Sequence, residues 1–499
     1  MQELTHYLNG AHVAGTSGRF ADVMNPATGE VQAHVPLAST SEVDQAIALA
    51  AAAQPAWAAT NPQRRARVMM KFVGLLNRDM DKLAEALSRE HGKTVPDAKG
   101  DVQRGLEVVE YCIGAPHLLK GEYTDSAGPG IDMYSMRQPL GVTAGITPFN
   151  FPAMIPMWMF APAIACGNAF ILKPSERDPS VPLMLNELME EAGLPKGILQ
   201  VVNGDKEAVD ALLHHPVVQS IGFVGSTPIA EYIYSTGCAN GKRVQCFGGA
   251  KNHMIVMPDA DMDQAADALV GAGYGAAGAR CMAISVAVPE GAEPADRLRE
   301  KLVPRIEKLK VGPYTAGNDV DYGPVVTAAA KANIERLVQT GIDQGAELVV
   351  DGRGFKLQGY EDGFFVGPHL FDRATPDMDI YQQEIFGPVL TTVRAQTYEE
   401  AIGLAMDHEY GNGTAIFTRD GDTARDFANR INIGMVGINV PIPVPLAYHT
   451  FGGWKKSVFG DLNQHGPDAF KFYTRTKTVT ARWPSGIKEG GEFSIPVME

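Results

Sequence analysis

The fold is decided by residues 141–176, which read GVTAGITPFNFPAMIPMWMFAPAIACGNAFILKPSE. Residues 141–146 and 169–172 are short apolar runs typical of strands, and the stretch between them favours a buried helix. Two more strands are predicted at 197–202 and 220–224, with helical stretches between the strands. Alternating strands and helices are typical of a parallel, doubly wound sheet, so the sequence predicts an α/β fold.

This region resembles a membrane span in composition, because no charged residue lies between Arg137 and Lys173. Five prolines interrupt it, however, and a lipid-exposed helix must satisfy its own backbone hydrogen bonds. We therefore expect the region to lie in a protein core, and we expect no membrane partner. Residues 1–30 are polar and rich in turn residues, so no targeting segment is expected there.

Length and composition limit the possible classes of protein. A chain of 499 residues is too long for one ordinary core and predicts two or three domains. The formal net charge of −15 argues against nucleic acid as a partner, because no basic excess is present to neutralise phosphates. The five cysteines lack CxxC spacing, which argues against a disulfide framework or a zinc site and favours a reducing, cytoplasmic setting.

The N-terminal part is predicted to be mostly helical. A capping-box pattern at 39–42 opens one helix, and helical periodicity continues over 63–93. A third helix is expected at about 97–119 and contains Arg104. Residues 120–138 lose this period and are expected to be extended.

Candidate site residues follow the predicted strands, because ligands of parallel α/β sheets bind beyond the carboxyl ends of the strands. Thr147, Phe149 and Asn150 follow the first strand, and Lys173 and Glu176 follow the second. Taken singly, these residues also fit ordinary loop and surface positions.

The usual dinucleotide motif GxGxxG does not follow any of these strands. Instead, the sequence GSTP at 225–228 opens a helix, and Ser226 is a plausible N-cap. The free backbone N–H groups at such a helix start can hold a phosphate. The alternative is an ordinary capped helix, and the residues leave both interpretations open.

A second α/β block is predicted over about 251–445, with strand-like runs at 347–350, 390–393 and 414–418. Residues 470–483 alternate threonine with aliphatic or aromatic residues, which predicts a late strand in an intersubunit sheet.

Cys281 is expected in the first helix of this block, after the small-residue run GAGYGAAGA at 271–279. Its neighbour is Arg280, and a positive charge beside a thiol lowers the pKa and favours the nucleophilic thiolate. The alternative for the cysteine alone is a buried structural residue.

Several motifs together resemble the aldehyde dehydrogenase superfamily. They are TPFNFP at 147–152, KPSE at 173–176, GFVGST at 222–227, Cys281, and EIFGPV at 384–389, in the family's order and spacing. The resemblance covers almost the whole chain. It implies two doubly wound α/β domains and a small β arm for oligomerisation.

The same resemblance implies domain boundaries. Residues 1–122 and 140–250 would form the NAD-binding domain, and 251–445 the catalytic domain. Residues 123–139 and 470–485 would form the oligomerisation arm, so a homo-oligomer, either a dimer or a tetramer, is expected.

Site roles also follow from the resemblance. Cys281 would attack an aldehyde, and the Asn150 side-chain amide with the Cys281 backbone N–H would hold the oxyanion. Lys173 and Glu176 would bind the adenosine ribose of NAD, and the Glu176 carboxylate would disfavour the 2′-phosphate of NADP. The other cofactor-binding residues would be Thr147, Phe149, Arg177, Ser226, Gly248, Glu384 and Phe386.

One position departs from the common family pattern. Most hydrolytic members carry a glutamate in an ELGGK motif, but the matching stretch here is CFGGAK at 246–251, with Phe247 in place of that glutamate. An aromatic ring cannot act as a general base, so water should attack the enzyme thioester slowly. A thiol ionises more readily than water, which makes coenzyme A a plausible acceptor.

This pattern, with GAKNH at 249–253 and RCM at 280–282, resembles the CoA-acylating methylmalonate-semialdehyde dehydrogenase subfamily. That resemblance implies oxidation of methylmalonate or malonate semialdehyde to propionyl-CoA or acetyl-CoA, with release of carbon dioxide. Arg104 and Arg280 would bind the substrate carboxylate, for which arginine has a suitable planar fork. The alternative is a hydrolytic NAD-dependent aldehyde dehydrogenase with another base, which produces a free acid.

Overall fold

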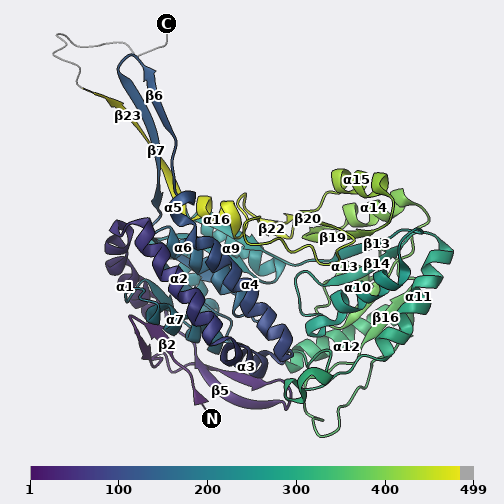
Figure 1. Ribbon diagram of the computed structural model, residues 1–499. Helices are drawn as coiled ribbons and strands as arrows, with labels where there is room; N and C mark the ends of the chain where they lie inside the picture. The colour runs from purple at the N-terminus through teal and green to yellow at the C-terminus, as the bar shows by residue number, and fades with distance from the viewer. Residues whose placement is uncertain (1, 484–499) are drawn as a thin grey trace.

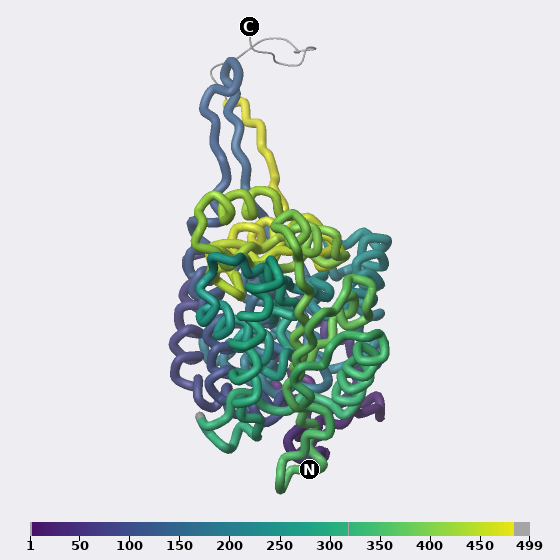
Figure 2. Tube along the Cα trace, turned by 90° about the vertical axis from the view of Figure 1, so that its right-hand side faces the viewer, coloured from purple at the N-terminus to yellow at the C-terminus, as the bar shows by residue number. Residues whose placement is uncertain are grey.

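A computed structural model describes residues 2–483 of the chain. Figure 1 shows two lobes side by side, with a long, narrow arm projecting from one of them. In Figure 2, turned by 90°, the arm rises from one end of the body, and the N-terminus lies near the opposite end.

The first lobe is built on an eight-stranded sheet. In spatial order its strands are β22 (Val458–Phe459), β12 (Arg243–Phe247), β11 (Val218–Val224), β8 (Val142–Ile146), β9 (Ala169–Lys173), β10 (Leu199–Val201), β2 (His6–Leu8) and β3 (Ala11–Val13). The strands from β12 to β10 run parallel, and β22, β2 and β3 are antiparallel additions at the two edges. The predicted doubly wound sheet is therefore present, and its parallel strands end at one common edge.

Helices cover both faces of this sheet. They are α1 (Thr40–Ala59), α2 (Pro62–Arg78), α3 (Met80–His91), α4 (Val95–Ile113), α5 (Ala115–Leu118), α6 (Met154–Ala165), α7 (Ser180–Glu191), α8 (Lys206–His214) and α9 (Thr227–Ala239). The single helical stretch predicted over 63–93 is divided at Asp79, whose ψ of 15° ends α2.

The uncharged region between Arg137 and Lys173 lies in the core, as predicted. Every residue of α6 is buried, and so is every residue of the flanking strands β8 and β9. Within residues 2–483, no helix is both long enough and apolar enough to cross a membrane.

The second lobe is built on a seven-stranded sheet. In spatial order its strands are β15 (Glu347–Val350), β16 (His369–Asp372), β17 (Val389–Thr392), β14 (Ile284–Pro289), β13 (Asn252–Val256), β19 (Gly413–Phe417) and β20 (Met435–Ile438). All pairs are parallel except β15 with β16. Its helical segments are α10 (Met262–Tyr274), η1 (Gly275–Gly278), α11 (Ala292–Glu307), η2 (Tyr314–Asp319), α12 (Ala328–Asp343), α13 (Asp379–Gln382), α14 (Tyr398–Asp407) and α15 (Gly421–Arg430).

The arm is a three-stranded antiparallel sheet in the order β23 (Thr474–Arg482), β7 (Ile131–Pro139) and β6 (Tyr123–Gly128). The register of β23 on β7 runs from Thr474 opposite Pro139 to Arg482 opposite Ile131. The strand predicted at 470–483 begins later, because α16 (Gly466–Phe472) precedes it. Residues 484–485 of the expected arm lie outside the described residues.

Two smaller sheets complete the fold. One pairs β1 (Gln2–Glu3), β5 (Glu30–Pro36) and β4 (Phe20–Asn25), and the other pairs β18 (Tyr410–Gly411) with β21 (Trp454–Lys455). On either side of β21 the chain returns to the first lobe, where Phe451 and Phe470 join the apolar core around α6. This return places residues far apart in the sequence against the same core.

Candidate active site

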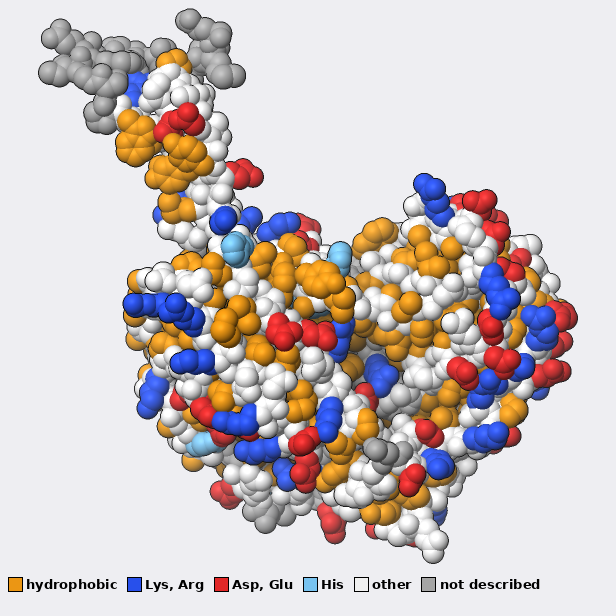
Figure 3. All heavy atoms as spheres, in the orientation of Figure 1, with side chains coloured by type: hydrophobic (Ala, Val, Ile, Leu, Met, Phe, Trp, Pro, Cys, Tyr) orange, Lys and Arg blue, Asp and Glu red, His pale blue; other side chains and the backbone are white. Residues whose placement is uncertain are grey.

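Two cavities meet at Cys281. The first, of about 400 Å³, is lined by Cys281 together with Asn150, Ser226 and Phe386. The second, of about 370 Å³, is lined by Cys281 together with Arg104 and Arg280. Figure 3 shows the surface hollowed between the two lobes.

The first cavity gathers most of the predicted cofactor residues from both lobes. Its lining includes Phe149, Asn150, Arg177, Ser226, Gly248, Glu384 and Phe386. Lys173 and Glu176 do not line it, but they lie at the end of β9 with their charged groups 3.5 Å apart. Thr147 also lies outside the lining, directly after β8, and its buried hydroxyl has no hydrogen-bond partner among the described residues.

Phe149 is held by ring contacts on several sides. Its ring centroid lies 6.0 Å from that of Phe386 in an edge-on contact, and 6.0 Å from the stacked ring of His91. The guanidinium of Arg177 lies 5.4 Å from the Phe149 ring centroid. Phe386 has a left-handed φ of 56°, an uncommon conformation that turns its ring into the cavity lining.

The backbone before Cys281 explains the run of small residues. Ala276 and Ala277 have φ values of 51° and 54°, and Gly278 has a φ of 74°. A Cβ at Gly278 would lie 2.0 Å from the carbonyl oxygen of Gly387. The prediction that Cys281 lies within a helix is therefore wrong, because left-handed residues end the helix and place Cys281 in a turn.

Two asparagines hold the main chain of Cys281. The side-chain amide of Asn252 donates to the Cys281 carbonyl oxygen at 2.9 Å, and that of Asn412 donates to the same oxygen at 3.0 Å. Neither asparagine is among the site residues predicted from the sequence. Asn252 belongs to the GAKNH stretch, whereas no local pattern marks Asn412.

Asn150 is buried, and its side chain faces the turn that carries Cys281. Its Nδ2 donates one hydrogen bond to the carbonyl oxygen of Ala279 at 3.2 Å. An amide nitrogen carries two N–H groups, so the second remains for a ligand in the cavity.

The prediction that Arg280 lowers the pKa of Cys281 below its usual value is wrong. Burial and, to a smaller extent, the nearby carboxylate of Glu384 together raise the pKa of the Cys281 thiol to about 12. Backbone N–H groups and Arg280 lower the pKa, but their effect is smaller. The Arg280 guanidinium is engaged by Asp97, with Nη2 and Oδ1 2.7 Å apart.

Glu384 and Lys251 form a buried acid and base beside the first cavity. Burial raises the pKa of Glu384 to about 7 and lowers that of Lys251 to about 7. The Lys251 ammonium donates to the carbonyl oxygens of Ile380 and Gln383, at 2.8 and 2.7 Å. These bonds fix the segment that carries Glu384.

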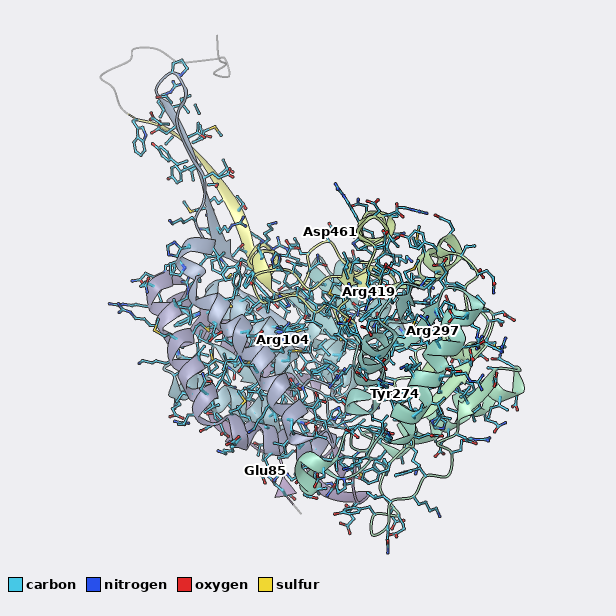
Figure 4. All side chains as sticks on the ribbon, turned by 45° about the vertical axis from the view of Figure 1, so that its right-hand side comes forward. Glu85, Arg104, Tyr274, Arg297, Arg419 and Asp461 are labelled. Atoms are coloured by element: carbon cyan, nitrogen blue, oxygen red, sulfur yellow. The ribbon has the colours of Figure 1, made fainter. Side chains whose placement is uncertain are left out.

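The second cavity brings the two predicted arginines together. Arg104 lies on α4 (Figure 4). Its Nη2 donates to the Pro445 carbonyl oxygen at 2.8 Å, and its Nη1 pairs with Glu107 of the same helix at 2.7 Å. Arg280 enters from the turn beside Cys281. Both side chains remain about a quarter exposed, so a carboxylate in the cavity can reach them.

Phe247 ends β12 as a buried residue. Its ring centroid lies 6.0 Å from that of Phe451, which lines the second cavity. The two carboxylates in that lining, Asp97 and Asp101, each pair with a cation. Phe247 thus packs an apolar ring against Phe451, behind the wall of the second cavity.

The residues present fit a bound dinucleotide. A Cβ at Gly248 would lie 2.9 Å from both the Lys456 carbonyl oxygen and the Thr227 hydroxyl, so bare backbone is required at this wall of the first cavity. Ser226 is the N-cap of α9, but its side chain makes no capping bond. Pro228 has no N–H, and the Ile229 N–H donates to the Ser226 carbonyl oxygen at 3.1 Å, so Thr227 is the residue of the first turn whose N–H can reach a phosphate.

Comparison with known proteins agrees with this geometry. The model of the family described as "Aldehyde dehydrogenase family" matches residues 12–479. The chain belongs to the aldehyde dehydrogenase family. The predicted family and fold are therefore confirmed.

Close relatives of this aldehyde dehydrogenase act on small semialdehydes, according to their names. A malonate-semialdehyde dehydrogenase of Pseudomonas aeruginosa is 58% identical over 99% of this chain and 100% of its own. An acylating mitochondrial methylmalonate-semialdehyde dehydrogenase of Arabidopsis thaliana is 48% identical over 95% of this chain and 78% of its own. A solved methylmalonate-semialdehyde dehydrogenase from Sinorhizobium meliloti, complexed with NAD, is 71% identical with a TM-score of 0.97, covering 98% of this chain and 99% of that one.

Proposed function

We propose that this protein oxidises malonate or methylmalonate semialdehyde with NAD and transfers the acyl group to coenzyme A, with release of carbon dioxide. The observation that carries the proposal is the position of Cys281. It lies between a cavity lined by Asn150 and the predicted cofactor residues and a cavity lined by Arg104 and Arg280. The relative from Arabidopsis thaliana that is named as acylating, and the phenylalanine at 247, support the acylating form.

The first half of the reaction forms a thioester on Cys281. The Cys281 sulfur bonds to the aldehyde carbon, and the carbonyl oxygen becomes an oxyanion bound by the Asn150 amide and the Cys281 backbone N–H. The substrate carboxylate lies between the Arg104 and Arg280 guanidinium groups. NAD held in the first cavity would supply the hydride acceptor, and loss of the hydride from the former aldehyde carbon lets the carbonyl group reform as the thioester.

The second half releases the product. In the thioester the substrate carboxylate is β to a carbonyl group, which can take up the electron pair when the carbon–carbon bond breaks and carbon dioxide leaves. Protonation of the resulting enolate gives an acyl group on Cys281. The thiolate of coenzyme A then attacks the acyl carbon, and the Cys281 thiolate leaves.

Cofactor binding is shared between the two lobes in this proposal. Lys173 and Glu176 bind the adenosine ribose hydroxyls, and the Glu176 carboxylate repels a 2′-phosphate, so NAD is preferred over NADP. The α9 N-terminus at Ser226 holds the pyrophosphate. Glu384 holds the nicotinamide ribose. The cavity wall around the cofactor is completed by Phe149, Arg177, Gly248 and Phe386. Thr147, directly after β8, would bind the cofactor from beside this lining.

The domain boundaries and the assembly are part of the proposal. The two sheets have largely separate apolar cores, which supports an NAD-binding domain of 1–122 and 140–250 and a catalytic domain of 251–445. The projecting arm of 123–139 and 470–485 would join copies into a homo-oligomer. A cytoplasmic location is consistent with the pattern of cysteines.

The function is tested by following NADH formation from malonate semialdehyde, with and without coenzyme A, and identifying the products by mass. We expect a burst near one NADH per site without coenzyme A, and steady turnover with acetyl-CoA as product once it is added. Cys281→Ala should abolish the burst. Cys238→Ala is the matched control, because Cys238 is exposed on α9.

The hydrolytic alternative gives a different result. Equal steady turnover without coenzyme A, with a free acid as product, would show that another base replaces the missing glutamate. A burst that persists in Cys281→Ala would contradict the role of this cysteine.

A further inference from the structure

The loop that carries Asn150 is held from behind by a buried ion pair. We propose that Lys93 and Asp101 are positioning residues that fix the main chain at Asn150, so that its side-chain amide stays directed at the Cys281 turn. This inference rests on the proposed function, because it assumes that Asn150 binds the oxyanion.

Lys93 makes the direct contact. It lies between α3 and α4, and its ammonium donates to the backbone carbonyl oxygen of Asn150 at 2.6 Å. The same ammonium lies 3.3 Å from a carboxylate oxygen of Asp101 and 4.4 Å from the ring centroid of Phe151. Both charged side chains are fully buried, so neither charge can be compensated by bulk water.

Asp101 extends the contact to the end of the loop. Its Oδ2 faces Lys93, and its Oδ1 accepts the backbone N–H of Met154 at 2.7 Å. Met154 is the first residue of α6. The ion pair therefore holds the loop at two points, Asn150 and Met154, from the rigid helix α4.

The side chain of Asn150 points toward the turn that carries Cys281. Its Nδ2 bonds to Ala279, two residues before Cys281, and its side chain lines the first cavity. Asn150 is thus the link between the ion pair and the turn that carries the nucleophile. An oxyanion donor must be held within a fraction of an ångström, so a loop released by the pair would bind the oxyanion less well.

Stability alone does not account for this pair. A buried ion pair adds little net stability, because desolvation offsets most of the attraction, and apolar side chains of similar volume often serve as well. Apolar side chains cannot bind the Asn150 carbonyl oxygen and the Met154 N–H. The effect that only the ion pair can provide is therefore to hold the backbone at Asn150 and Met154 in place.

The test is a mutant cycle on the NADH burst rate. Lys93→Met with Asp101→Leu removes both charges of the pair together, so neither partner is left without the other. We expect Asn150→Ala to lower the burst rate by about 10²- to 10³-fold, and the pair variant to lower it by about 10- to 100-fold. Because the pair acts through Asn150, the triple variant should match Asn150→Ala within about twofold.

Controls separate positioning from folding. The matched control is Lys206→Met with Asp210→Leu, which removes another Lys–Asp ion pair, on α8, away from both cavities. The dissociation constant for NAD and the melting temperature are measured for each variant. We expect the pair variant to bind NAD normally while its burst rate falls.

Several outcomes would overturn the inference. They are a pair variant with an unchanged burst rate, multiplicative losses in the triple variant, or a loss of burst rate that follows a loss of NAD binding. If Asn150→Ala itself keeps a normal burst rate, the proposed role of Asn150 fails instead. The two failures are therefore distinguishable.

Discussion

At the scale of single residues, the reactivity of Cys281 depends on more than its neighbour in the sequence. Its pKa is raised to about 12 by burial and by Glu384, while Arg280 is paired with Asp97. The thiol is therefore protonated at neutral pH in this state of the protein. Since the thiolate is the nucleophile, the local charge at Glu384 controls how readily Cys281 reacts.

Alkylation of Cys281 by iodoacetamide should reveal this environment. Below the pKa the thiolate fraction rises tenfold per pH unit, so the rate should rise between about pH 7 and pH 10 without a plateau. Glu384→Gln removes a like charge, which lowers the Cys281 pKa and speeds alkylation at about pH 9. Subtracting the rate of Cys281→Ala accounts for other cysteines, and a plateau below about pH 8 would contradict the raised pKa.

Arg104 provides a second prediction at this scale. Hydrogen bonds to charged groups are worth about 1.5–3 kcal/mol, so Arg104→Met should lower kcat/KM for malonate semialdehyde by about 10- to 100-fold. Oxidation of propanal, which has no carboxylate, should change little. Arg297→Met is the matched control, because Arg297 lies on α11 in the second lobe (Figure 4). Equal losses for both aldehydes would contradict a role in carboxylate binding.

At the scale of elements, β23 forms one edge of the arm's sheet. Within residues 2–483, β23 pairs only with β7, and Tyr123 and Met133 on the neighbouring strands are exposed. An exposed edge with apolar side chains favours pairing with another chain. This is the structural reason for placing the subunit contact on the arm.

Proline substitutions on β23 test that contact. Successive backbone N–H groups of a strand point to opposite edges. Of the two variants Thr478→Pro and Val479→Pro, one therefore removes a hydrogen bond to β7, and the other removes an N–H donor on the edge that faces away from β7. We expect both to reduce the mass measured by light scattering, with the body still folded by circular dichroism. Thr478→Ala is the control, and an unchanged mass in both proline variants would exclude β23 from the contact.

At the scale of the whole molecule, the first cavity joins the two lobes. Phe149 and Ser226 come from the first lobe, whereas Asn333 and Phe386 come from the second. A ligand that fills this cavity therefore binds only when both lobes are folded. Its binding free energy should stabilise them together.

Thermal unfolding with NAD tests this coupling. At 100 times its dissociation constant, NAD should raise the free energy of unfolding by about 2.7 kcal/mol and shift the whole transition. Lys173→Met should weaken NAD binding and reduce the shift at the same NAD concentration. If calorimetry instead shows one lobe unfolding at an unchanged temperature, the cavity does not couple the lobes.

The sequence by itself determined the order of strands and helices, the family, and the residues around the cofactor cavity. These signals are local: apolar periodicity sets the elements, and the motifs TPFNFP, KPSE and GFVGST lie at the carboxyl ends of β8, β9 and β11. Asn150 and Ser226 could be found in this way because strand ends meet at one edge of a parallel sheet.

Only the tertiary structure decided the turn at Cys281, its raised pKa, and the contacts of Asn412 and Lys93. These features depend on burial and on atoms brought together from distant parts of the chain. Asn412 lies 131 positions from the cysteine whose carbonyl oxygen it binds. Lys93 lies 57 positions from Asn150. Periodicity and spacing contain no information on such pairs, because the packing of whole elements fixes their distances.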